Sequence, residues 1–175
     1  NSLPSWGWLG PGRGRPRFLG ERDAPASHAG RVGGMEMRIC LIGVTGHIDY
    51  VFQGMAKDPA CRIVGVAPGS PGEKTERLAG RPEVGGARFY TDYRKMLDEL
   101  RPEIAVVACH FCDHARVTVE ALARGCHVFV EKPLALTFED LALVKKAYAA
   151  ANRHLAAMFG LRYAPWFLTA WEGVQ

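Results

Sequence analysis

The chain has 175 residues, of which 48% are hydrophobic and 23% charged, and this is enough for one globular domain with a full core. The net charge of +4 comes mostly from the segment before Met35, where five arginines face two acidic residues, so the basic balance does not indicate a nucleic-acid partner. We expect no membrane-spanning segment, because no apolar run is long enough. The five cysteines favour a reduced, cytoplasmic protein over a disulfide framework.

Residues 1–34 are rich in glycine, proline and arginine and show no apolar periodicity, which predicts a disordered extension. The next segment predicts a strand, a tight turn and a helix. An apolar run from Met37 ends at Gly43, Gly46 follows in the turn, and a helical spacing of apolar residues then begins. That helix face consists of Ile48, Val51, Phe52 and Met55.

A strand, a glycine turn and a helix form the first unit of a dinucleotide-binding fold, where the turn and the helix start receive a pyrophosphate. The glycine fingerprint is incomplete, because Thr45 and Ile48 occupy its second and third positions. A side chain at Thr45 hinders a close approach of phosphate to the backbone, and Gly46 is the candidate to replace it. The alternative is an ordinary strand, turn and helix without a nucleotide.

Strands and helices alternate along the rest of the chain, which predicts an α/β fold with a doubly wound parallel sheet, a Rossmann-type domain over residues 35–160. The expected strands are 62–67, 88–90, 104–108, 127–130 and 155–159, and the expected helices are 92–100, 113–124 and 137–151. After strand 62–67 the usual ribose-binding acid is replaced by Pro68, Gly69 and Ser70. The site could therefore accept the 2′-phosphate of NADP, with Lys74 or Arg77 as its partner. The alternative is that both side chains are solvated charges on a helix.

Three strand ends carry residues suited to chemistry. Glu131 and Lys132 precede Pro133, and such a pair can orient a sugar or a nicotinamide, although a solvated ion pair is the alternative. Arg162 follows the last strand and is suited to phosphate or carboxylate, or is a surface cation.

The end of strand 104–108 contains Cys109 and Cys112 in a C-x-x-C motif, with His110 and His114 beside them. A redox dithiol and a zinc site are two interpretations. A structural zinc needs four ligands and no second ligand pair follows at a suitable spacing, so we predict no metal. Unreactive cysteines in a buried strand end and its loop are the third interpretation.

Residues Gly125 to Ala135 resemble the G-K-H-V-x-x-E-K-P-L-A motif of the Gfo/Idh/MocA family of NAD(P)-dependent oxidoreductases. His114 matches the histidine that opens the preceding helix, and Arg162 to Pro165 resembles the family's R-Y-x-P. The resemblance covers residues 37–175. It implies a Rossmann domain that binds NAD or NADP, and a small-molecule sugar or polyol substrate in the intact protein, which could be a homo-oligomer.

The resemblance implies a role for each matching residue. Lys132 is the expected catalytic residue, beside the nicotinamide and the substrate. The expected cofactor-binding residues are Gly43, Thr45, Gly46, His47, Ile48, Cys109, His110, Phe111, His114, Glu131, Lys132 and Arg162.

The intact enzyme is therefore expected to transfer a hydride between NAD(P) and a sugar- or polyol-like substrate. The alternative is a non-catalytic Rossmann ligand sensor or pseudoenzyme. This alternative is favoured by the departures in the cofactor site, where Cys109-His110-Phe111 replaces the family's Thr-Pro-Asn. The family continues into a second domain that holds the substrate and a proton-transfer Asp and His. We therefore expect residues 161–175 to begin the helix leading there, and this chain alone to be inactive.

Overall fold

The structure is a computed structural model that describes residues 36–160 and 164–173. The predicted disorder of residues 1–34 and the role expected of Arg162 concern residues outside this description, and both stay predictions.

Six parallel strands form one sheet in the order β3-β2-β1-β4-β5-β6. This confirms the predicted Rossmann-type α/β fold. The strands are β1 (Met37–Ile42), β2 (Cys61–Ala67), β3 (Arg88–Phe89), β4 (Ile104–Val107), β5 (His127–Val130) and β6 (Leu155–Ala157). All six point the same way, so the loops after their last residues lie along one edge of the sheet, called here the carboxyl edge.

The helices are α1 (Asp49–Met55), α2 (Tyr93–Leu100), α3 (His114–Ala123), α4 (Phe138–Ala151) and α5 (Pro165–Gly173). Three short 3-10 helices were not predicted: η1 (Thr75–Leu78), η2 (Pro82–Val84) and η3 (Phe111–Asp113). No described helix has the length and apolar character needed to cross a bilayer.

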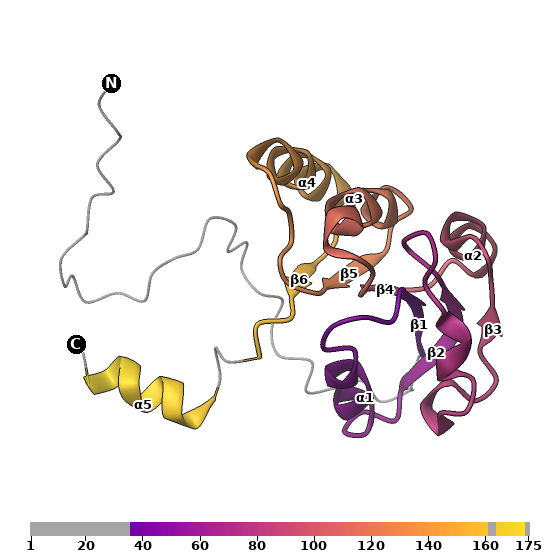
Figure 1. Ribbon diagram of the computed structural model, residues 1–175, viewed down its shortest axis with the longest axis horizontal. Helices are drawn as coiled ribbons and strands as arrows, with labels where there is room; N and C mark the ends of the chain where they lie inside the picture. The colour runs from indigo at the N-terminus through magenta and orange to yellow at the C-terminus, as the bar shows by residue number, and fades with distance from the viewer. Residues whose placement is uncertain (1–35, 161–163, 174–175) are drawn as a thin grey trace. The chain divides into compact units, whose positions relative to one another are not determined.

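Two hydrophobic cores lie on opposite faces of the sheet. Helices α2, α3 and α4 cover one face, and α1 covers the other (Figure 1). Side chains of β1 alternate between them, so that Cys40 and Ile42 join the first core while Ile39 and Leu41 join the second. Because β1 is buried on both faces, the turn that follows it starts from a fixed position.

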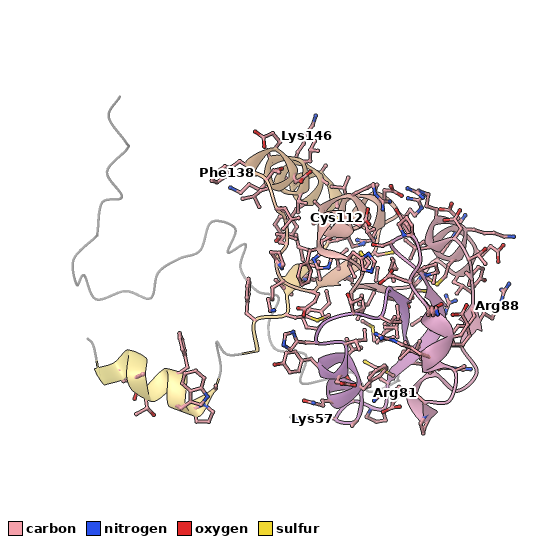
Figure 2. All side chains as sticks on the ribbon, in the orientation of Figure 1. Lys57, Arg81, Arg88, Cys112, Phe138 and Lys146 are labelled. Atoms are coloured by element: carbon pink, nitrogen blue, oxygen red, sulfur yellow. The ribbon has the colours of Figure 1, made fainter. Side chains whose placement is uncertain are left out.

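Side-chain caps begin two of these helices. Asp92 accepts a hydrogen bond from the Arg94 N–H at 2.8 Å, and Thr137 accepts one from the Asp140 N–H at 3.0 Å. Helix α4 buries only Val144 fully, and Phe138 at its first turn projects into solvent, 87% exposed (Figure 2).

Candidate functional site

The turn after β1 is held against the end of β4. Gly43 has φ +82°, and a side chain there would overlap the backbone of Cys109. The Thr45 N–H donates to the Ala108 carbonyl at 2.7 Å, and its hydroxyl lies 2.9 Å from the same oxygen and 2.6 Å from the Cys109 carbonyl. The Thr45 side chain therefore bonds back to β4, which removes the steric objection raised from the sequence.

A buried carboxylate joins this turn to the end of β5. Glu131 is 0% exposed and accepts the His47 N–H at 2.9 Å and the Lys132 N–H at 2.7 Å. Its Oε1 also lies 2.5 Å from Nδ1 of the His47 ring. Gly46, with φ +63°, packs so closely that an added Cβ would overlap the Glu131 carboxylate. The glycine at position 46 is thus required by Glu131.

Burial alone would raise the pKa of the Glu131 carboxyl group. The hydrogen bonds from the His47 ring and from the Lys132 and His47 N–H groups outweigh burial, so the Glu131 pKa lies below its ordinary value of 4.5. An ionised carboxylate only accepts hydrogen bonds, so His47 Nδ1 carries the shared proton. The His47 ring also stacks on Tyr50 at 5.2 Å between centroids.

Lys132 has a fixed backbone and an exposed side chain. Its N–H donates a hydrogen bond to the buried Glu131 carboxylate at 2.7 Å. Within residues 36–160 and 164–173 its ammonium forms no ion pair. The lysine expected to be catalytic is therefore free to meet a ligand at the carboxyl edge.

His114 lies beneath this edge, fully buried. Its Nδ1 lies 2.7 Å from the Pro133 carbonyl and its Nε2 lies 3.0 Å from the Cys109 carbonyl. The ring thus lies between the end of β4 and the loop after β5, and because a neutral imidazole carries one N–H, one of these two carbonyls accepts a hydrogen bond from it. The contact with the cofactor that the sequence predicted for His114 stays a prediction.

The two cysteines of the C-x-x-C motif lie in different environments. Burial raises the pKa of the Cys109 thiol to about 12, whereas Cys112 is exposed and lies 3.8 Å from an Asp113 carboxylate oxygen. In the described part of the chain, no group of three or more potential metal ligands occurs. All five cysteines are free. Buried and exposed single thiols describe this motif better than a redox pair does.

His110 and Phe111 stand exposed at the start of the β4–α3 loop. The His110 N–H donates to the Ser70 hydroxyl at 3.1 Å, and the Phe111 ring meets the His114 ring edge-on at 5.6 Å. This loop therefore lies between the glycine turn and the end of β2.

A cavity of about 390 Å³ opens at the end of β2. It is lined by the loop from Pro68 to Glu73, by the start of α2 and by Arg116 of α3. Lys74 and Arg77, the cations predicted for this place, do not line it; Arg94 and Arg116 do. Sequence reasoning missed these two arginines because they come from helices that follow β3 and β4, and only the folded sheet brings them to β2.

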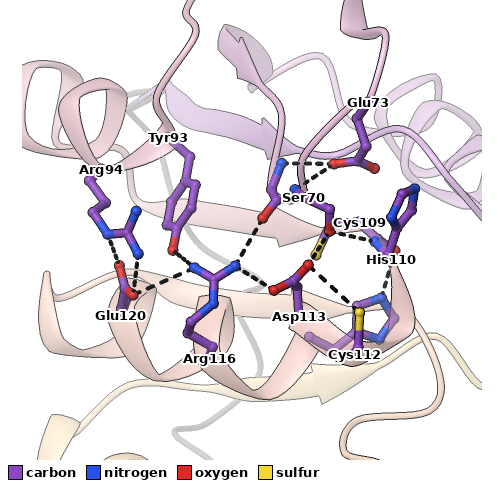
Figure 3. A network of polar contacts seen from close by, with 12 residues as sticks. Ser70, Glu73, Tyr93, Arg94, Cys109, His110, Cys112, Asp113, Arg116 and Glu120 are labelled. Carbon is purple, nitrogen blue, oxygen red and sulfur yellow. Dashed lines mark hydrogen bonds and ion pairs between the residues drawn. The ribbon is translucent and has the colours of Figure 1, made fainter.

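A polar network joins several of the residues that line this cavity to their neighbours (Figure 3). Arg116 bonds Asp113 at 2.6 Å, the Tyr93 hydroxyl at 2.6 Å and the Gly69 carbonyl at 3.2 Å. The Ser70 hydroxyl also donates to Asp113 at 2.6 Å. Burial opposes ionisation of Asp113, but the Ser70 and Arg116 contacts outweigh it and hold the Asp113 pKa below its ordinary value. The loop after β2 is thereby fastened to α2 and α3.

These features fit a dinucleotide. In the part of the chain that the structure describes, the Gly46 N–H has no acceptor, and it belongs to the turn where a pyrophosphate would bind. The cavity at the end of β2 stands where an adenosine ribose is expected in this fold. The exposed Lys132 lies at the end of β5, across the glycine turn from that cavity.

Comparison with known proteins agrees with the geometry. Residues 37–159 match the Gfo/Idh/MocA oxidoreductase family with an NAD-binding Rossmann fold. The chain is 39% identical to a Thermotoga maritima protein assigned to the oxidoreductases, with a TM-score of 0.69 over 77% of this chain and 42% of that one. It is 25% identical to the WlbA dehydrogenase of Chromobacterium violaceum, solved with NADH and UDP-GlcNAcA, with a TM-score of 0.63 over 74% and 36% of the two chains.

A curated relative is glycosyl hydrolase family 109 protein 2 of Akkermansia muciniphila, which is 27% identical over 163 residues. The match covers 89% of this chain and 34% of that protein. The chain thus spans about a third of the length of this relative and about two fifths of the solved Thermotoga chain.

Proposed function

Because the chain belongs to the Gfo/Idh/MocA oxidoreductase family, with its NAD-binding Rossmann fold, we propose that it is the nucleotide-binding part of a dehydrogenase. The complete enzyme transfers a hydride between NAD(P) and a sugar- or polyol-like substrate. The observation that carries the proposal is the Glu131 bridge, which ties the glycine turn to the backbone of Lys132 and leaves the lysine side chain open.

The bound nicotinamide nucleotide supplies the hydride donor or acceptor. In this proposal the turn from Gly43 to Ile48 holds the pyrophosphate, and the loop from Cys109 to Phe111 borders the nucleotide. Lys132 binds the reacting hydroxyl group and carries its proton. Glu131 and His114 act on neighbouring backbone, so we assign them positioning roles.

The relatives support a sugar as the substrate class. The Chromobacterium dehydrogenase was solved with a sugar nucleotide, and the Akkermansia relative is named a glycosyl hydrolase. Because of the name of the Akkermansia relative, glycoside hydrolysis is the second candidate activity. The five free cysteines support a reduced compartment such as the cytoplasm.

Calorimetric titration of this chain with NAD and NADP tests the nucleotide site, and binding of at least one at micromolar to millimolar concentration is expected. The protein extended to the full length of its relatives is then assayed for NAD(P) reduction with sugars and polyols, and for release of a chromophore from aryl glycosides. Reduction supports the first activity and chromophore release the second. No heat with either nucleotide up to millimolar concentration contradicts the proposal and favours a ligand sensor.

A further inference from the structure

Glu73 turns back onto the two residues that follow the end of β2. One of its oxygens, Oε2, accepts the Gly69 N–H at 2.8 Å and the Ser70 N–H at 2.9 Å. In dinucleotide-binding folds this position meets the adenosine ribose, either with an acid for the 2′-hydroxyl or with a cation for a 2′-phosphate. The carboxylate missing from Pro68, Gly69 and Ser70 is thus supplied from three residues further along (Figure 3).

The same contacts remove the groups that a 2′-phosphate would use. Phosphate binds to backbone N–H groups and to cations, but here the two N–H groups already bond Glu73. The cations that line the cavity are also engaged. Arg94 lies 2.6 Å from Glu120, and Arg116 lies 2.6 Å from Asp113. The carboxylate of Glu73 therefore occupies the binding position of an external anion.

The charge around the cavity opposes a second anion. Glu73 and Asp92 line it together with the two arginines. Asp113 and Glu120 form ion pairs with those arginines, so four carboxylates accompany two guanidinium groups. A 2′-phosphate would enter a region of net charge −2, whereas a ribose hydroxyl carries no charge.

The second carboxylate oxygen of Glu73 also favours NAD over NADP. Glu73 Oε1 is buried and meets no hydrogen-bond donor among the described residues. A carboxylate oxygen only accepts, and a ribose hydroxyl has a proton to donate, whereas a phosphate dianion has none. The 2′-hydroxyl of NAD can therefore donate to this oxygen after a small side-chain movement, whereas the 2′-phosphate that replaces it in NADP cannot.

We propose that Glu73 is a specificity-determining residue that makes this domain select NAD over NADP. The inference rests on the proposed function, because it assumes that the carboxyl edge binds a nicotinamide nucleotide. The inference adds that the nucleotide is NAD and that Glu73 disfavours NADP.

The test is calorimetric titration of the chain with NAD and with NADP, for wild type, Glu73→Ala and Glu73→Gln. Wild type is expected to bind NAD at least about tenfold more tightly. Glu73→Ala frees both N–H groups and one negative charge, so it is expected to reduce that ratio about tenfold, mainly through tighter NADP binding. Glu73→Gln keeps an acceptor for the loop while removing the charge, and is expected to reduce the ratio part of the way.

Glu76→Gln is the matched control, since it removes one exposed carboxylate three residues away that does not line the cavity. It is expected to leave the ratio unchanged. An unchanged ratio in both Glu73 variants, or a wild type that binds NADP as well as NAD, overturns the assignment but leaves nucleotide binding intact. Failure of wild type to bind either nucleotide refutes the proposed function itself, so the two failures are distinguishable.

Discussion

Two carboxylates at the carboxyl edge both accept hydrogen bonds from loop N–H groups, but they differ in how many donors they bind. Glu131 at the end of β5 and Glu73 after β2 each accept two backbone N–H groups from a loop. Glu131 is 0% exposed, uses both oxygens and adds the His47 ring as a third donor. Glu73 is partly exposed, bonds through one oxygen and leaves the other without a donor among the described residues.

The difference separates a structural role from a selective one. A buried carboxylate with both oxygens bonded fixes a turn and contributes to folding, since removing it leaves buried donors unpaired. A carboxylate with spare accepting capacity beside a cavity can still respond to a ligand. We therefore expect changes near Glu131 to alter stability and turnover, and changes at Glu73 to alter nucleotide choice.

The largest effect is expected for Lys132→Met in the protein extended to the full length of its relatives. Loss of a positioned proton-transfer group lowers kcat by a factor of roughly 10²–10⁴. Lys146→Met is the control. Lys146 is exposed and lies in α4, away from the end of β5, so this variant should keep wild-type kcat. Steady-state kinetics decides, and equal kcat in both variants removes Lys132 from the mechanism.

The next effect is on folding. Gly46→Ala forces a left-handed φ of +63° on a residue with a side chain and drives its Cβ into Glu131. We expect the free energy of unfolding to fall by about 1–3 kcal/mol in urea titrations. Gly54→Ala is the control, because Gly54 lies in α1 with open space around it and should gain about 0.5–1 kcal/mol. A neutral Gly46→Ala would mean that Glu131 does not constrain the turn.

A smaller effect is a pH dependence of stability. The Glu131 pKa is lower in the folded protein than its ordinary value of 4.5, so ionised Glu131 stabilises the fold above that pH. This stabilisation is lost as the pH falls through the folded pKa. Glu131→Gln should therefore be less stable than wild type at pH 7, and the gap should narrow in more acidic buffer. A gap that stays constant down to pH 3 would show that the charge is unimportant.

The smallest effect concerns the last helix. Trp166 and Phe167 at the start of α5 are 62% and 40% exposed, and exposed aromatic side chains promote association. We expect light scattering to detect self-association of the chain, and a version ending at Phe159 to associate less. A clean monomer for the longer form, with a worse-behaved short form, would contradict this.

The sheet could be predicted from the sequence because its signals are local. Apolar runs such as Ile104 to Val107 and helix caps such as Thr137 lie within a few neighbouring residues. The alternation of strands and helices also predicted that the sheet is parallel, whereas the order of its strands was not predicted. The boundaries agree within two residues for every described strand, and the short 3-10 turns were missed because they bury few residues.

The contacts of the site could be predicted only in part. The motif around Glu131 and Lys132 indicated a ligand edge, but not that Glu131 would bind His47, 84 residues earlier. The sequence suggested a missing acid after β2, whereas Glu73 reaches back to supply it. Such contacts depend on backbone geometry and on distant loops meeting, which no local pattern encodes.

The central position of β1 has a consequence for how the molecule assembles. Its partner on one side, β2, begins at Cys61, but its partner on the other side, β4, begins at Ile104, and the Arg38 N–H bonds a carboxylate 65 residues away. Contacts of such long sequence separation slow folding, because a large loop must close before they form. During synthesis, β1 therefore waits for most of the domain to emerge from the ribosome before the sheet can close around it.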